Sequence, residues 1–118
     1  MRYADHVAPY TITDYIHDYR GYVVWRVGTG RTVEVLQLFA SEYRQGYGTS
    51  MLADMCAKLA DTDAVTVFGF TRAHAIKAQA FYISLGFKLI RIPAMYAEGD
   101  AVLFTQNLTM LKDKLHAH

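Results

Sequence analysis

The chain contains one cysteine, Cys56, among its 118 residues, and so it cannot form an internal disulfide. A chain of this kind fits a reducing compartment. The sequence also lacks an apolar stretch of membrane-spanning length, and residues 1–5 lack the apolar core of a signal peptide. These absences predict a soluble, cytoplasmic protein without a membrane partner.

The chain also lacks an excess of either sign of charge, because 12 Lys and Arg residues nearly balance 11 Asp and Glu residues. A net charge of +1 and the lack of a basic run give no field for the phosphates of nucleic acid. The nine tyrosines could stack on bases, but without a basic groove we interpret them as half-buried sheet residues. The five histidines show no metal-ligand spacing. We therefore expect neither a nucleic-acid partner nor a metal.

Apolar residues are plentiful, at 53% of the chain, with 14% aromatic. At this length they suffice for one domain, residues 1–118, around one core. The segment 13–19 could be a short helix or a strand. The expected strands are 21–27, 32–39, 64–70, 87–92 and 101–106, and the expected helices are 46–60, 73–85 and 108–115.

The order of these elements already restricts the sheet. The first two expected strands form a hairpin, because only a short glycine turn separates them. The strand, helix, strand order over residues 32–70 implies a parallel pair with a right-handed crossover. Cys56 falls on the apolar stripe of the helix between them, which predicts core packing rather than a catalytic thiol. Pro93 is expected to end the strand that begins at residue 87.

An apolar strand is joined to the first long helix by residues 43–49, which read Tyr-Arg-Gln-Gly-Tyr-Gly-Thr. A helix N-terminus carries unpaired amides and a positive dipole end, and such a cluster binds anions, above all a pyrophosphate. Gly46 and Gly48 would let a ligand approach the backbone, and Arg44 could add charge-assisted hydrogen bonds. Taken alone, the same residues are equally typical of a tight strand-to-helix turn.

A second motif follows at residues 78–87, which read Ala-Gln-Ala-Phe-Tyr-Ile-Ser-Leu-Gly-Phe. The helix that carries Tyr82 ends near Gly86, and a strand begins at Phe87. In this order and at this separation, the two motifs resemble those of the GNAT superfamily, the acyl-CoA-dependent N-acyltransferases. The resemblance covers residues 32–107.

The resemblance implies an α/β (α+β) fold with a mixed, mostly antiparallel sheet. A central pair of parallel strands would splay apart, and helices would flank the sheet. The chain would be a short, single-domain member of the family with a reduced N-terminal region. It departs from the family pattern at Tyr43, where Arg or Gln is preferred, and at Ala75, where relatives often carry Asn.

The resemblance also implies acetyl-CoA as the cosubstrate. In the family, the pantetheine arm lies between the splayed strands and the pyrophosphate lies on the glycine loop. Backbone groups of the central strand would bind the arm, while loop amides and hydroxyls would bind the phosphates. The residues expected to contact acetyl-CoA are Leu38, Phe39, Ala40, Arg44, Gln45, Gly46, Tyr47, Gly48, Thr49 and Ser50.

Two residues are candidates for the chemistry. Direct attack of an amine on a thioester needs an uncharged amine, a polarised carbonyl and a proton for the departing thiolate. Tyr82 lies at the family position for the phenol that faces the thioester sulfur, and it is the candidate general acid. Glu34 is the candidate base, because it is the one acidic residue within the central strand. Asp100, Glu98 and His17 are weaker candidates.

The predicted function is transfer of an acetyl group from acetyl-CoA to a primary amine. The acceptor could be a peptide N-terminus, a lysine, a polyamine or a small-molecule amine. The alternative is a degenerate member of the fold that binds CoA or a protein partner without catalysis. Gly46, Gly48 and Tyr82 favour the enzyme, whereas Tyr43 and Ala75 favour the alternative. A homodimer is left open.

Overall fold

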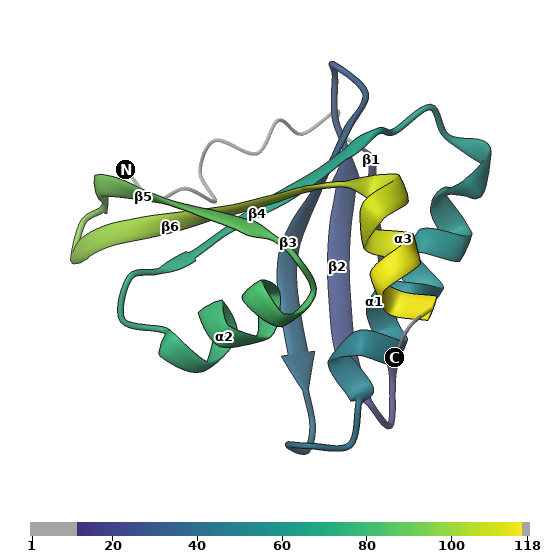
Figure 1. The fold of residues 1–118 in the computed structure, drawn as a ribbon, viewed down its shortest axis with the longest axis horizontal. Coiled ribbons are helices and arrows are strands. Elements are labelled where there is room, and N and C mark those ends of the chain that lie inside the picture. The colour runs from purple at the N-terminus through teal and green to yellow at the C-terminus, as the bar shows by residue number, and fades with distance from the viewer. Residues whose placement is uncertain (1–11, 117–118) are drawn as a thin grey trace.

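One six-stranded sheet and three α-helices make up the fold in a computed structural model that describes residues 12–116 (Figure 1). In chain order the elements are β1 (Ile12–Asp18), β2 (Gly21–Val27), β3 (Thr32–Ala40), α1 (Tyr47–Lys58), the short 3-10 helix η2 (Leu59–Asp61), β4 (Thr66–Arg72), α2 (Ile76–Ser84), β5 (Lys88–Tyr96), β6 (Gly99–Asn107) and α3 (Leu108–His116). Within residues 12–116, no helix is both long and apolar enough to cross a membrane.

The strands lie in the order β1-β2-β3-β4-β6-β5. Only the β3–β4 pair is parallel, and α1 forms the crossover between these two strands. The other neighbouring pairs are antiparallel, including the predicted β2–β3 hairpin. The predicted mixed sheet with one central parallel pair is therefore confirmed. The segment left open between helix and strand is the edge strand β1, whose backbone pairs with β2.

The prediction that Pro93 ends a strand is wrong, because β5 continues to Tyr96. Proline cannot donate a backbone hydrogen bond, but β5 lies at the edge of the sheet. A residue of an edge strand whose nitrogen faces away from the neighbouring strand needs no hydrogen-bond partner in the sheet. The pairing with β6 is irregular between Ile92 and Tyr96, where Ala94 adopts a positive φ of 51°. The Ala94 amide donates to Oδ1 of Asp100 at 2.8 Å. This hydrogen bond gives the Ala94 amide a partner where the backbone pairing with β6 is irregular.

Three boundaries differ from the expected ones around residues 64–76. β4 occupies Thr66–Arg72 rather than 64–70, and α2 begins at Ile76 rather than at residue 73. Hydrogen bonds hold the turn between β4 and α2, and neither periodicity nor residue type predicts them. The side-chain amide of Gln79 donates to the carbonyl of Ala73 at 2.9 Å, and the backbone amide of Ala73 donates to the carbonyl of residue 100 at 3.0 Å.

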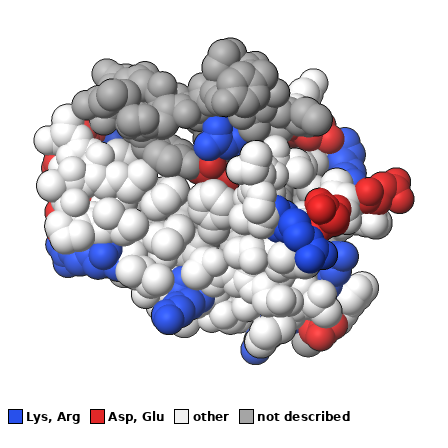
Figure 2. Space-filling view, turned by 90° about the horizontal axis from the view of Figure 1, so that it is seen from above, with Lys and Arg blue, Asp and Glu red and all other residues white. Residues whose placement is uncertain are grey.

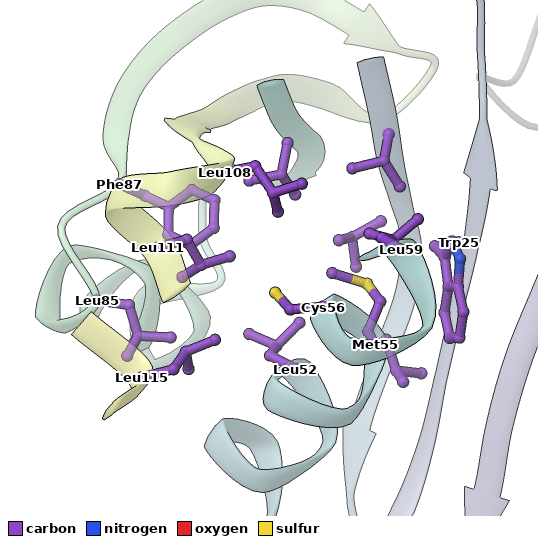
Figure 3. Packing of buried hydrophobic residues seen from close by; sticks show 14 of the residues in the cluster. Trp25, Leu52, Met55, Cys56, Leu59, Leu85, Phe87, Leu108, Leu111 and Leu115 are labelled. Carbon is purple, nitrogen blue, oxygen red and sulfur yellow. The ribbon is translucent and has the colours of Figure 1, made fainter. Parts of the chain in front are cut away.

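The core lies between the sheet and the helices (Figures 1 and 3). Leu52 and Cys56 of α1 lie near Leu111 and Leu115 of α3, with Trp25 of β2 behind α1 (Figure 3). Cys56 is 4% exposed, and burial raises the pKa of its thiol to about 11. The prediction that this cysteine packs in the core is confirmed.

Gly69 of β4 lets the Phe104 ring lie against the sheet. A Cβ at residue 69 would lie 2.3 Å from Cζ of Phe104 and 2.7 Å from the carbonyl oxygen of Val35. We expect Gly69→Ala to lower the free energy of unfolding by about 1–3 kcal/mol, because both groups must move. Urea unfolding measures the loss. Gly28→Ala is the matched control, since its nearest contact would be the Thr32 hydroxyl at 3.2 Å. Equal losses in the two variants would contradict the packing role.

Candidate active site

The parallel strands β3 and β4 separate in the middle of the sheet. Their pairing ends where Val35 lies opposite Gly69. Both strands continue past this point, β3 to Ala40 and β4 to Arg72. Backbone groups of β3 past Val35 therefore lie beyond the parallel ladder, where a ligand could pair with them.

A bulge in β3 explains why the strands separate at this point. Trp25 and Val24 are consecutive on β2, but their partners on β3 are Val35 and Gln37. Leu36 is therefore an extra residue in β3. A bulge bends its strand and increases the local twist, so β3 turns away from β4 directly after their last pair.

A cleft of about 310 Å³ opens where the strands separate. Residues from β2, β3, β4, α2 and β6 line it. They are Tyr22, Val35, Leu36, Gln37, Leu38, Phe39, Phe70, Thr71, Ala78, Tyr82 and Phe104. None of these side chains carries a charge at neutral pH. The cleft therefore suits an uncharged ligand segment that can also bond to strand backbone.

Tyr82 of α2 forms part of the wall of this cleft. It is 6% exposed, and its ring stacks on Phe104 with centroids 3.7 Å apart and planes 10° apart. Phe81 and Phe87 make edge contacts with the same ring. Burial raises the pKa of the phenol, so the hydroxyl remains protonated at neutral pH. Tyr82 therefore lines the cleft as a protonated phenol, and its role as the acid stays a prediction.

Glu34 of β3 is 2% exposed and lies one residue before the last pair of the parallel ladder. Its Oε1 accepts a hydrogen bond from Nε of Arg26 at 3.0 Å and forms an ion pair with Nη2 of the same residue at 2.8 Å. Its Oε2 is buried and has no partner among the described residues. Burial raises the pKa of this carboxyl to about 7. A carboxyl of this kind, with one free oxygen, is matched to accept a proton near neutral pH.

Tyr82 and Glu34 approach the separated strands from opposite faces of the sheet. Val35 belongs to the same core cluster as Tyr82. Successive side chains on a strand point to opposite faces, so Glu34 points away from the helices. Accordingly, Val35 lines the cleft and Glu34 does not. The two candidates therefore lie on opposite faces of the sheet, and their action on one bound group stays a prediction.

The loop predicted to bind a pyrophosphate ends in a left-handed glycine. Gly46 has a φ of 72° and caps α1, which begins at Tyr47. The Ser50 amide donates to the Gly46 carbonyl at 2.9 Å, as the first bond of the helix. The amides of residues 47–49 lie before this bond and are left for other acceptors. The first turn also carries no acidic side chain, which favours an anion there.

Two residues of the predicted loop site have contacts within the fold. A Cβ at Gly48 would lie 3.1 Å from the Phe81 ring, so glycine at this position lets α1 approach α2. The Ser50 hydroxyl oxygen accepts a hydrogen bond from Arg20 at 2.7 Å, and Arg20 also pairs with Asp54 at 2.8 Å. The fold thus gives these two residues reasons to be present that do not depend on a ligand.

Lys77 is a residue that the sequence analysis did not find. Its Nζ lies 4.5 Å from the centroid of the Tyr43 ring, which places a positive charge beside the loop. Arg44 is exposed in the same loop and has a φ of 61°. In the sequence, Lys77 is one lysine near the start of a helix, and spacing alone does not bring it to residue 43.

The predicted backbone contacts lie at different distances from the cleft. Leu38 and Phe39 line it, whereas Ala40 lies beyond it and pairs with Gly21 of β2. Gln45 is exposed in the loop, and Thr49 is half-buried in the first turn of α1. The predicted set therefore spans a continuous path from the cleft to the start of α1.

The weaker candidates for the base have partners of their own. A hydrogen bond from the Ala94 amide lowers the pKa of Asp100, which keeps that carboxyl charged. Glu98 forms an ion pair with Arg72 at 2.7 Å. His17 is exposed on the edge strand β1. None of these three side chains lines the cleft.

Charges of both signs are visible on the face of the molecule in Figure 2. On the face in Figure 2, Lys and Arg side chains lie among Asp and Glu side chains, without a continuous basic area in the described part. Within residues 12–116, no group of three or more His, Cys, Asp and Glu side chains could hold a metal ion. The cleft and the adjoining loop together form the candidate site.

The raised pKa of Glu34 makes stability depend on pH. Because about 7 exceeds the ordinary value of 4.5, its contribution is complete below pH 4.5 and is lost as pH rises through 7. Over this window the wild type should lose roughly 3 kcal/mol of unfolding free energy relative to Glu34→Gln. Urea unfolding across the window measures it. Asp100→Asn is the control, since the lowered pKa of Asp100 has the opposite sign. If the unfolding free energy of Glu34→Gln changed with pH as steeply as that of the wild type, the burial of the Glu34 carboxyl would be contradicted.

Comparison with known proteins identifies the fold. No family model matches the sequence, and no curated protein matches it. A GNAT-family protein from Desulfovibrio desulfuricans matches with a TM-score of 0.69 and 19% identity over 81% of this chain and 69% of that chain. The ribosomal-protein-S18-alanine N-acetyltransferase from Escherichia coli matches at 0.65 and 18%, over 90% and 74%. NAA60 from Arabidopsis thaliana in complex with acetyl-CoA matches at 0.65 and 18%, over 75% and 65%. At these identities the similarity establishes the fold, and this chain has the fold of the GNAT acetyltransferases.

Proposed function

We propose that the protein is an N-acetyltransferase that moves an acetyl group from acetyl-CoA to a primary amine by direct attack. The observation that carries this proposal is the cleft at the bulge of β3, where a free strand edge and a buried phenol face the same gap. The neighbours in fold support it. One is in complex with acetyl-CoA, and another is named as an alanine N-acetyltransferase.

The groups from the cleft to α1 suit the chemistry of acetyl-CoA. The strand edge at residues 38–40 offers backbone donors and acceptors to the amides of the pantetheine arm. The amides of residues 47–49 and the positive end of α1 would bind the pyrophosphate. Arg44 and Lys77 add positive charge at the rim of this loop.

The proposed reaction uses the two buried groups in turn. As the amine nitrogen attacks the thioester carbonyl, Glu34 takes the nitrogen's proton, directly or through a water. The carbon–sulfur bond then breaks, and Tyr82 gives its phenolic proton to the sulfur. The products are an amide and the CoA thiol. Proton return from Glu34 to Tyr82 through solvent restores both groups.

The acceptor is proposed only as a primary amine. The E. coli neighbour is named for an alanine of ribosomal protein S18, so a peptide that begins with alanine belongs in the first panel of acceptors. Lysine peptides, polyamines and small amines complete that panel. We further propose that the chain works as one domain in the cytoplasm.

A binding module without catalysis is the second candidate. It is favoured by Ala75, the residue that caps α2 without any side-chain hydrogen bond. A relative with Asn there would offer a polar contact that this chain lacks. Tyr43 similarly replaces the Arg or Gln preferred in the family, although Lys77 and Arg44 bring charge to the same loop.

Binding of acetyl-CoA should depend on Lys77. We expect calorimetry to detect binding to the wild type and thermal melts to show stabilisation by excess acetyl-CoA. Lys77→Gln should weaken the affinity by about fivefold, the factor that roughly 1 kcal/mol gives. Lys88→Gln is the control, because Lys88 is exposed on the edge strand β5. Equal affinities for the two variants would exclude the loop as the phosphate site. Absence of any wild-type binding would count against both candidate functions.

Turnover should depend on the Tyr82 hydroxyl. Tyr82→Phe keeps the ring on Phe104, so the fold and the acetyl-CoA affinity should change little. Loss of the acid should lower kcat by roughly 10²-fold or more on a confirmed amine acceptor. Tyr15→Phe, at an exposed position of β1, is the control. Full turnover in Tyr82→Phe would make this tyrosine a packing residue. Binding without transfer to any amine of the panel would favour the binding module.

A further inference from the structure

Arg26 and Glu34 form an ion pair on the sheet face that points away from the core. They are in register on the neighbouring strands β2 and β3. The Arg26 side chain is 17% exposed and the Glu34 side chain 3%. Either partner alone would be a charge with little access to water, so the two side chains depend on each other.

The geometry of the pair is asymmetric. Nε of Arg26 donates to Oε1 of Glu34 at 3.0 Å, and Nη2 forms an ion pair with the same oxygen at 2.8 Å. A guanidinium often bonds both oxygens of a carboxylate instead, one from each of two nitrogens. Here Oε2 is buried and has no partner among the described residues. An acceptor left in this state is costly in a folded protein, and it can be satisfied by a donor on a ligand.

Among residues 12–116, Arg26 is the cation in direct contact with the Glu34 carboxyl. On β4, the apolar Phe68 lies opposite Glu34. On β5, Tyr96 is close enough for the charge of Glu34 to act on it, although burial is the main reason that its pKa is raised. Arg72 stacks on Tyr96 at 4.5 Å and pairs with Glu98 at 2.7 Å. The second arginine of this face is therefore already engaged.

We propose that Arg26 is a positioning residue for Glu34, which it fixes through Oε1 so that Oε2 alone takes the proton of the attacking amine. This inference rests on the proposed function. The N–H bond of the amine breaks, its electron pair stays on the nitrogen that bonds to the acetyl carbon, and the proton forms a bond with Oε2. Arg26 does not touch the reacting atoms. It sets the direction of the carboxyl and favours its ionised form.

The arginine fork matters as well as its charge. Two nitrogens of one rigid plane contact Oε1 and restrain the position of that oxygen, whereas a lysine ammonium is a point charge with rotatable donors. Arg26→Lys should therefore retain most of the charge effect and lose part of the orientation. Arg26→Gln should lose both.

The test combines a titration with kinetics. Carbon-13 NMR of the Glu34 carboxyl should show a pKa that is higher in Arg26→Gln than in the wild type by about one unit or more. The acidic limb of the kcat profile should move to higher pH by the same amount, while KM for acetyl-CoA stays unchanged. Arg26→Lys should shift the limb less and still lower kcat at its plateau. Arg91→Gln is the control, because Arg91 forms an exposed pair with Asp100.

The outcomes separate this inference from the proposed function. An unchanged Glu34 titration in Arg26→Gln overturns the inference, whatever the activity. A shifted titration with an unshifted kcat profile also overturns it, since Arg26 would then act on a group that does not limit the reaction. If Arg26→Gln does not fold, Arg26→Lys decides, and a wild-type plateau of kcat in that variant overturns the role. Failure of the proposed function looks different, because the wild type would then acetylate no amine at any pH.

Discussion

The extra residue at Leu36 is the constraint on which the site depends. A regular β3 would continue to pair with β4, and their facing backbone groups would be used up within the sheet. The bulge ends that pairing at Val35 and Gly69 and opens a cleft in the middle of an otherwise continuous sheet. A gap at this place can admit an extended ligand without a separate pocket built from loops.

Core packing positions the chemistry at this gap. Gly69 lies in the last parallel pair, and the absence of a side chain there lets Phe104 lie flat under Tyr82. The candidate acid Tyr82 is thus held by stacking on Phe104, whose ring lies beside Gly69 in the last parallel pair. On the other face, the cross-strand register holds Glu34 against Arg26. Apolar packing thus holds Tyr82, and an ion pair holds Glu34, near the point where the pairing of β3 with β4 ends.

Pattern reading could predict the order of the elements, the parallel pair and the two motifs, because these depend on local periodicity and glycine. It could not predict the edge position that lets β5 pass Pro93, since edge status is a property of the whole sheet. It predicted Glu34 and Tyr82 as candidates from strand position and resemblance. The pairing of Glu34 with Arg26 and the approach of Lys77 to Tyr43 needed three-dimensional neighbours. Gly48 shows the converse, because a motif glycine also has a packing role against Phe81.

The central claim is that the strand edge exposed by the bulge and the amides at the start of α1 form one binding path. Amide hydrogen exchange, measured residue by residue with and without saturating acetyl-CoA, tests this claim most directly. The account predicts slower exchange at residues 37–40 and 47–49 in the presence of acetyl-CoA, with no change along the edge strand β5. Unchanged exchange at both segments, or slowing confined to other parts of the chain, would contradict it.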